Sequence, residues 1–97
     1  MKSLTPARFQ ILRAQIPEWT RRGAVIRRTF TFADFAAALR FVNAVGRAAE
    51  AAAHHPDIDI RWNRVRLALT THDAGGLTLK DVELAAHCDR FATTAQR

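Results

Sequence analysis

The sequence predicts an α+β domain in which three helices pack on one face of a four-stranded antiparallel sheet, in the order α-ββ-α-ββ-α. Segments with apolar residues at helical spacing begin at capping signals, and the segments between them alternate apolar and polar residues as strands do. The strands come in adjacent pairs joined by short turns, which favours antiparallel pairing. Because the chain has 97 residues, we expect a single domain spanning residues 1–97.

The first helix is expected to begin at Thr5-Pro6, since threonine caps helices and proline suits the first helical position. Pro17 should end it, and its apolar face consists of Phe9, Leu12 and Ile16. Residues 19–30 then form two β-prone runs on either side of Gly23, which predicts a hairpin.

A long helix and a second hairpin follow. The capping-box pattern over Thr31-Phe32-Ala33-Asp34 predicts that the helix begins at Phe32, and Pro56 limits it to about Ala53. Its expected buried stripe is Phe35, Leu39, Val42 and Ala49. The strand residues Ile58, Ile60 and Trp62 then alternate in one register, and Val65, Leu67 and Leu69 alternate in the other. This change of register predicts a turn or bulge at Asn63-Arg64.

The last helix is preceded by the Gly75-Gly76 loop. Thr78 and Asp81 form a capping box, and Leu77 can pack on Val82 across the helix start. We expect this helix to bury Leu84, Cys88 and Phe91.

The net charge is +6, and it is concentrated in residues 1–50. Such an excess suits a nucleic-acid partner. However, arginine far outnumbers lysine, a bias that GC-rich coding alone could produce. Alternate residues of a hairpin also face opposite sides, so Arg21, Arg22, Arg27 and Arg28 cannot form one flat patch. We therefore expect no specific nucleic-acid partner, and only weak, sequence-independent binding.

Several classes of protein are disfavoured by what the sequence lacks. Cys88 is the single cysteine, so no disulfide framework exists within the chain. No apolar run is long enough to cross a membrane, and residues 1–15 do not resemble a secretory signal. Zinc-ligand spacings, phosphate-binding loops and nucleophile elbows are absent. These features predict a cytoplasmic protein without a metal site.

Three of the four histidines fall at the ends of predicted elements. His54 and His55 lie between the long helix and the next strand, and His72 follows the last strand. If both positions lie at one edge of the sheet, the imidazoles converge and can exchange protons near neutral pH. The alternative is that histidines at a helix C-terminus only cap its carbonyl groups.

Two further residues have both a structural and a functional interpretation. Asp81 can simply reach back to the N-cap amide, or it can also orient a nearby histidine. Trp19 can be an ordinary core residue, or it can form the wall of a pocket for a flat ring.

The joint spacing of these residues resembles the signature of the pterin-4a-carbinolamine dehydratase family. The signature comprises an acidic residue, a His-His-Pro run, an aromatic residue, a histidine and an aspartate. It is met here by Glu50, His54, His55, Pro56, Trp62, His72 and Asp81. Similarity extends to Trp19, to Arg28-Thr29-Phe30-Thr31-Phe32 and to Thr71-His72-Asp73-x-Gly75-Gly76, and covers about residues 17–91.

The resemblance implies dehydration of 4a-hydroxytetrahydropterin to quinonoid dihydropterin, in the recycling of the tetrahydrobiopterin used by aromatic amino-acid hydroxylases. It implies no metal or redox cofactor, because the pterin is the substrate. His54 and His72 would be the acid–base pair, and His55 a second proton-handling group. The substrate-binding residues would be Glu50, Pro56, Trp19, Thr71, Asp73 and Asp81, with Asp81 holding His72 in its useful tautomer.

The resemblance also implies a homodimer or homotetramer. Animal members of the family act as dimerisation partners of a homeodomain transcription factor. The alternative function is therefore a non-catalytic interaction module that acts like a transcriptional coactivator.

Overall fold

The computed structural model of the protein describes residues 2–95, so residues 1, 96 and 97 of the predicted domain lie outside it. It contains a four-stranded antiparallel sheet with the strand order β1-β2-β4-β3. The strands are β1 (Thr20–Arg22), β2 (Val25–Thr31), β3 (Asp57–Arg61) and β4 (Arg64–Leu69). Both predicted hairpins are present, β1 with β2 and β3 with β4.

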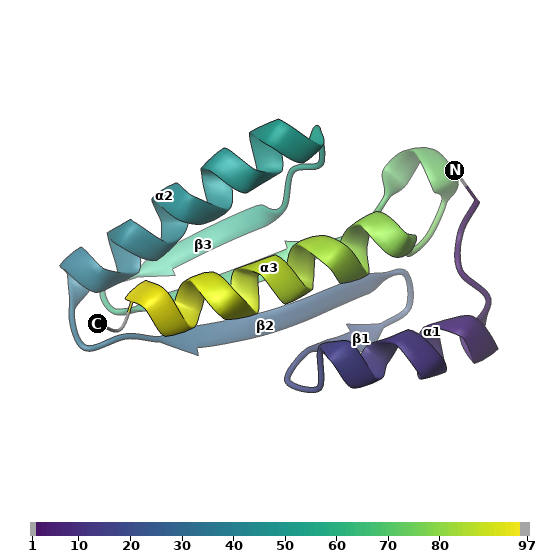
Figure 1. Ribbon diagram of the computed structural model, residues 1–97, viewed down its shortest axis with the longest axis horizontal. Coiled ribbons are helices and arrows are strands. Elements are labelled where there is room, and N and C mark those ends of the chain that lie inside the picture. Colours follow the sequence, from purple (N-terminus) through teal and green to yellow (C-terminus); the bar gives the residue numbers. More distant parts are fainter. Residues whose placement is uncertain (1, 96–97) are drawn as a thin grey trace.

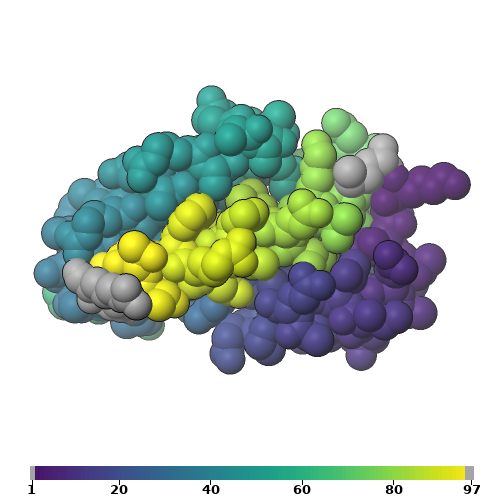
Figure 2. All heavy atoms as spheres, viewed as in Figure 1, coloured from purple at the N-terminus to yellow at the C-terminus, as the bar shows by residue number. Residues whose placement is uncertain are grey.

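Three helices cover one face of this sheet, which confirms the predicted fold class (Figure 1). They are α1 (Pro6–Leu12), α2 (Phe35–Ala52) and α3 (Leu79–Ala95), with short 3-10 turns η1 (Arg13–Gln15) and η2 (His72–Ala74). On the face drawn in Figure 2, the atoms of the helices leave little of the sheet visible. No helix within residues 2–95 is long and apolar enough to cross a membrane.

The core lies between the helices and the inward face of the two central strands. It is built from alternate residues of β2 and β4 and from the inner stripes of α2 and α3. The fully buried members include Ile26, Val65, Leu67, Leu69, Phe41, Val45 and Val82. Burial of this apolar surface is the main force that holds the helices on the sheet.

The start of α2 differs from the prediction. Asp34 is itself the N-cap, and its Oδ1 atom accepts a hydrogen bond of 2.8 Å from the amide of Ala37. The amide of Phe32 instead donates to the carbonyl of Asn63, and the Phe32 ring is buried in the core. Phe32 therefore extends the sheet region, and the helix begins three residues later, at Phe35.

The buried stripe of α2 also differs from the predicted one. Phe35 and Leu39 are 45% and 39% exposed, whereas Phe41 is fully buried. The Phe41 ring lies 4.6 Å from Phe30 and 5.0 Å from Phe32 between ring centroids. This aromatic cluster sets the rotation of the helix, so that its inward stripe is Ala38, Phe41, Val45 and Ala49.

Two smaller differences concern the second hairpin and α3. The turn joins Arg61 to Arg64 through Trp62 and Asn63, one residue earlier than expected. Trp62 has a left-handed backbone with φ of 49°. In α3, Leu84 and Cys88 are buried as predicted, but Phe91 is only half-buried.

The C-terminal end of α2 reverses the chain at Ala53. Ala53 has a left-handed backbone, and its amide donates to the carbonyl of Glu50 at 3.2 Å. The amide of His54 donates to the carbonyl of Ala49 at 3.0 Å. These two bonds form a Schellman motif, which ordinarily has glycine at the left-handed position. Alanine there is strained, because its Cβ atom approaches the following carbonyl.

We predict that Ala53→Gly raises the free energy of unfolding by about 1 kcal/mol, because glycine adopts this conformation without that contact. Urea denaturation measures the change. Ala51→Gly is the control, since Ala51 lies within the last turns of α2 and glycine there should destabilise the protein by about 0.5–1 kcal/mol. Equal destabilisation by both substitutions would contradict this account of the helix end.

Candidate active site

The reversal at Ala53 directs the side chain of His54 into the protein. His54 is only 8% exposed, and its Nε2 atom lies 2.5 Å from the Oδ1 atom of Asp81. Asp81 lies in the first turn of α3, so this contact joins the end of one helix to the start of the other.

The Asp81 carboxylate is fully buried, and donors surround it. Its Oδ2 atom accepts from the hydroxyl of Thr71 at 2.7 Å and from the amide of Thr78 at 2.9 Å. The hydroxyl groups of Thr71 and Thr78 lie 2.9 Å apart. A buried carboxylate is tolerated only when its oxygens are bonded in this way. The predicted capping contact of Asp81 is therefore confirmed, and it is part of a larger network that includes Thr78.

The network determines which nitrogen of the His54 ring carries the proton. An ionised carboxylate only accepts hydrogen bonds, so Nε2 must carry the proton that it shares with Asp81. The structure gives no hydrogen bond to the Nδ1 atom of His54. Among residues 2–95, no buried side-chain nitrogen or oxygen lacks a partner, so Nδ1 must reach the surface. This arrangement leaves one ring nitrogen available to a ligand.

The prediction that Asp81 holds His72 is wrong. Asp81 contacts His54 rather than His72, because the Schellman motif turns His54 inward. His72 begins the η2 turn and is exposed to solvent. It nevertheless follows directly after Thr71, whose hydroxyl binds Asp81, so both histidines belong to the same end of the sheet.

The side chains of Glu50 and His55 form a second pair, at the surface. The Glu50 carboxylate contacts the imidazole of His55 rather than that of His54, one helical turn away, because the chain reverses at Ala53 and turns His54 inward. Pro56 follows, half-buried, and leads into β3. Because both members of the pair are exposed, they remain accessible to a bound molecule.

The η2 turn contributes backbone groups. The carbonyl groups of Thr71 and His72 already accept hydrogen bonds from Ala74 and Gly75 within the turn. The first amides of such a turn have no acceptor inside it, so those of His72 and Asp73 can donate to a ligand. The Asp73 side chain is exposed.

Trp19 is a core residue rather than a wall of this site, which corrects one expectation. It is 2% exposed, and its Nε1 atom donates to the Oδ1 atom of Asp89 at 2.8 Å. Asp89 lies eight residues beyond Asp81 on α3, or about 12 Å along the helix axis.

Trp62, the aromatic residue of the sequence pattern, also lies outside the site within this chain. It is 68% exposed and occupies the β3–β4 turn. Strand β3 begins beside the histidines and ends at this turn, which places Trp62 at the opposite end of the sheet (Figure 1).

Other chemistry receives no support from the described residues. No group of three or more histidine, cysteine or acidic side chains within residues 2–95 is arranged to hold a metal ion. Burial raises the pKa of the Cys88 thiol to about 12. The thiol is therefore protonated at neutral pH and is a poor nucleophile.

Comparison with known families gives a match over nearly the whole chain. The sequence model described as pterin 4 alpha carbinolamine dehydratase matches residues 2–91. A relative from Chloroflexus aurantiacus is 58% identical over 91 residues, covering 94% of this chain and 98% of the relative. A relative from Acidobacterium capsulatum is 55% identical over 86 residues, covering 89% and 94% respectively. Both are provisionally named pterin-4-alpha-carbinolamine dehydratase.

Two solved structures share the fold. A crystal structure from Brucella melitensis, described as a transcriptional coactivator/pterin dehydratase, has a TM-score of 0.90 and 29% identity. The alignment covers 94% of this chain and 99% of that protein. A pterin dehydratase-like protein described as a RuBisCO assembly factor in the alpha-carboxysome has a TM-score of 0.64 and 21% identity, covering 76% and 86%. The second likeness concerns the fold alone.

We predict that Thr71→Val lowers the free energy of unfolding by about 1.5–3 kcal/mol, because it removes a hydrogen bond to a buried carboxylate while keeping the side-chain shape. Equilibrium urea denaturation tests this. Thr93→Val is the matched control: the Thr93 hydroxyl donates to a backbone carbonyl at 3.4 Å on the exposed side of α3, so the change should stay within about 0.5 kcal/mol. Similar losses in both variants would refute the importance of the network.

Proposed function

The chain belongs to the pterin 4 alpha carbinolamine dehydratase family, and we propose that it converts a 4a-hydroxytetrahydropterin into the quinonoid dihydropterin and water. The observation that carries this proposal is the His54–Asp81 pair, which presents one imidazole nitrogen to the surface. A positioned imidazole is the group that such a proton transfer requires near neutral pH.

The reaction needs both an acid and a base. The C4a–O bond breaks and its electron pair leaves with the oxygen, which must gain a proton because hydroxide is a poor leaving group. A ring nitrogen of the pterin loses a proton, and its electron pair forms the new C=N bond. The substrate itself supplies every atom of the products, so the proposed reaction uses no other cofactor.

His54 and His72 are the proposed acid–base pair. His54 gains or releases a proton at Nδ1, while Asp81 holds Nε2–H and stabilises the imidazolium form, as the aspartate of a catalytic triad does. Asp81 is thus a positioning residue. His72 is exposed beside Thr71. From there it carries out the other proton transfer, as the partner of His54 in the acid–base pair.

The remaining site residues are proposed to bind the pterin. The amides of His72 and Asp73 suit the acceptor atoms of a pterin edge, and the exposed Glu50 carboxylate suits its N–H groups. His55 is oriented by Glu50 and is the second proton-handling group. Pro56 fixes the backbone after these histidines.

The proposed biological setting is the recycling of the tetrahydrobiopterin used by an aromatic amino-acid hydroxylase. Hydroxylation leaves the pterin as its 4a-hydroxy form, which this reaction would remove.

A second candidate function is an interaction module that acts like a transcriptional coactivator. The similarity to the Brucella melitensis protein supports it, since that protein is described as both a transcriptional coactivator and a pterin dehydratase. A pure binding module has no need to keep the whole set of Glu50, His54, His55 and His72, so dehydratase activity remains the favoured function. Turnover of 4a-hydroxytetrahydropterin distinguishes the two.

We also propose that the chain forms a homodimer or homotetramer. Apolar side chains along α2 and the edge strand β3 are partly exposed, namely Phe35, Leu39, Ile58 and Ile60. An edge strand with unpaired backbone groups and an adjacent apolar surface is ordinarily covered. A second copy would cover both features symmetrically.

His54→Ala and His72→Ala should each lower the turnover of 4a-hydroxytetrahydropterin about 100-fold or more, because each removes one of the proton-transfer groups. The rate is measured above the spontaneous reaction, and thermal melting verifies that each variant is folded. His87→Ala is the control, since His87 is an exposed histidine of α3 that lies outside the site. Unchanged rates in both site variants would refute the proposed function.

Sedimentation velocity should detect a dimer or tetramer, and introducing charge by L39E and I60E together should shift it to the monomer. I11E is the control, because Ile11 is 71% exposed on α1, beside the opposite edge of the sheet (Figure 1). A wild-type monomer at every concentration would contradict the proposal.

A further inference from the structure

The face of the sheet that carries no helices is rich in arginine. In β2 and β4, Ile26 pairs with Leu69 and Phe30 with Val65, and these buried residues face the helices. The alternate residues of all four strands therefore point to the opposite face. We call this the open face, and its arginines are Arg22, Arg27, Arg61, Arg64 and Arg66.

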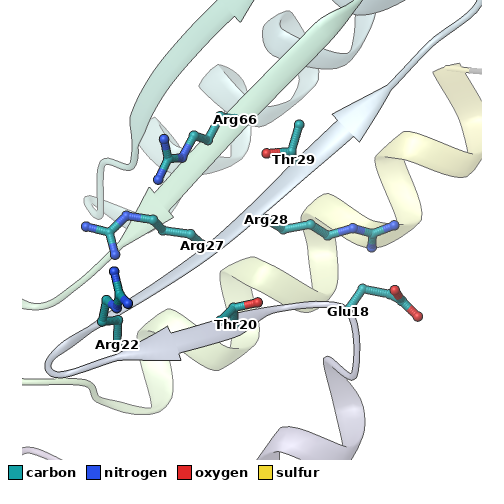
Figure 3. Close-up of a pocket in the computed structure, with 7 residues that line it drawn as sticks. All are labelled: Glu18, Thr20, Arg22, Arg27, Arg28, Thr29 and Arg66. Atoms are coloured by element: carbon teal, nitrogen blue, oxygen red, sulfur yellow. The ribbon is translucent and has the colours of Figure 1, made fainter.

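The strand order brings three of these arginines together. Arg22, Arg27 and Arg66 come from β1, β2 and β4, which are neighbours in the sheet. Figure 3 shows their guanidinium groups turned toward one another, whereas Glu18 and Arg28 point away from them. A shallow hollow of about 450 Å³ lies here, and the hydroxyl residues Thr20 and Thr29 also line it. A second hollow continues from Thr29 and Arg66 to Arg61 and Arg64.

Few anions on the protein balance this charge. The strand residues of the open face include two acidic ones, Asp57 and Asp59, both on the edge strand β3. Glu18 also lines the first hollow, but its side chain points away from the three arginines (Figure 3). Asp59 pairs with Arg61 at 3.2 Å. Within residues 2–95, Arg22, Arg27 and Arg66 have no ion pair. Like charges on adjacent strands repel, so a bound anion would stabilise this cluster.

The other two hairpin arginines lie on the helix side, as alternation predicts. Arg28 pairs with Asp89 at 2.7 Å, and the Arg21 guanidinium lies 5.0 Å from the centre of the Phe9 ring. The prediction that the four hairpin arginines cannot form one patch is therefore confirmed. The open-face cluster instead depends on Arg66, which joins through the pairing of β2 with β4.

The side chains of the open face are better suited to bind phosphate groups than to bind the surface of another protein. The guanidinium group of arginine can donate two parallel hydrogen bonds to the oxygens of one phosphate, and threonine hydroxyls add neutral donors. The strand residues of this face include no aromatic side chain, and the apolar ones are only Val25 and Ala68. Protein interfaces have apolar or aromatic centres, and single-stranded nucleic acids are bound by stacking on aromatic rings. Protein surfaces that bind duplex DNA are polar and positively charged, as the open face is.

We propose that the open face binds the phosphate backbone of duplex nucleic acid, without selecting its sequence. Arg22, Arg27 and Arg66 are the central contacts, and Arg61 and Arg64 extend the surface along the second hollow. This binding is separate from the histidine site and does not depend on the proposed dehydratase activity.

Fluorescence anisotropy with two labelled 20-base-pair DNA duplexes of unrelated sequence tests the proposal. At 50 mM salt we expect the same affinity for both, with Kd on the order of 10⁻⁵ M. The slope of log K against log salt should be about −3, since each of about three neutralised phosphates contributes about 0.9. The triple variant R22Q/R27Q/R66Q should bind at least tenfold more weakly, with a much shallower slope, because only Arg61 and Arg64 then remain on the open face.

The control triple variant is R8Q/R47Q/R90Q, which removes the same charge from exposed positions on α1, α2 and α3. It should stay within about threefold of the wild type, and both triple variants should keep wild-type dehydratase turnover. The proposal is overturned if the wild type binds neither duplex, if both triple variants lose affinity equally, or if one duplex is preferred more than tenfold. Equal affinity for a polyglutamate peptide as long as the duplex would also overturn the proposal, because the open face would then bind acidic protein segments equally well.

Discussion

Asp81 places a carboxylate in the interior of a thin protein, and a charge removed from water must be matched by donors. Those donors come from three places: His54 after α2, Thr71 after β4, and the amide of Thr78 before α3. The carboxylate therefore holds together the end of the sheet and the ends of two helices. The same bonds that satisfy it also fix the orientation of the His54 imidazole, whose second nitrogen reaches the surface. Stability and the proposed chemistry thus depend on a single group.

The layered fold separates two kinds of surface. Helices cover one face of the sheet and build the histidine site at its end, where α2 and β4 both terminate (Figure 1). Every second strand residue points to the opposite face. That face is polar because many of these residues are arginines. A ligand of the histidine site and a polyanion on the open face would therefore contact different sides of the same sheet.

Local signals in the sequence predicted the elements well, and long-range pairings account for what they missed. The Thr78–Asp81 capping contact spans one helical turn and was visible in the sequence. The His54–Asp81 bond joins residues 27 positions apart and depends on the left-handed Ala53, which has no glycine to signal it. The rotation of α2 follows from the fit of Phe41 against two rings of the sheet. The position of Arg66 beside Arg22 and Arg27 requires the strand order, which hairpin signals alone do not give.

The central claim is that Asp81 holds a proton on the Nε2 atom of His54 and leaves Nδ1 free to act. The most direct measurement is a histidine-selective ¹H–¹⁵N NMR spectrum of the protein at mildly alkaline pH, with His54 assigned by comparison with His54→Gln. We predict an Nε2–H proton of His54 that resonates far downfield, exchanges slowly with water and is lost in Asp81→Asn. A His54 ring that carries its proton on Nδ1, or an Nε2–H that exchanges freely with solvent, would contradict the account.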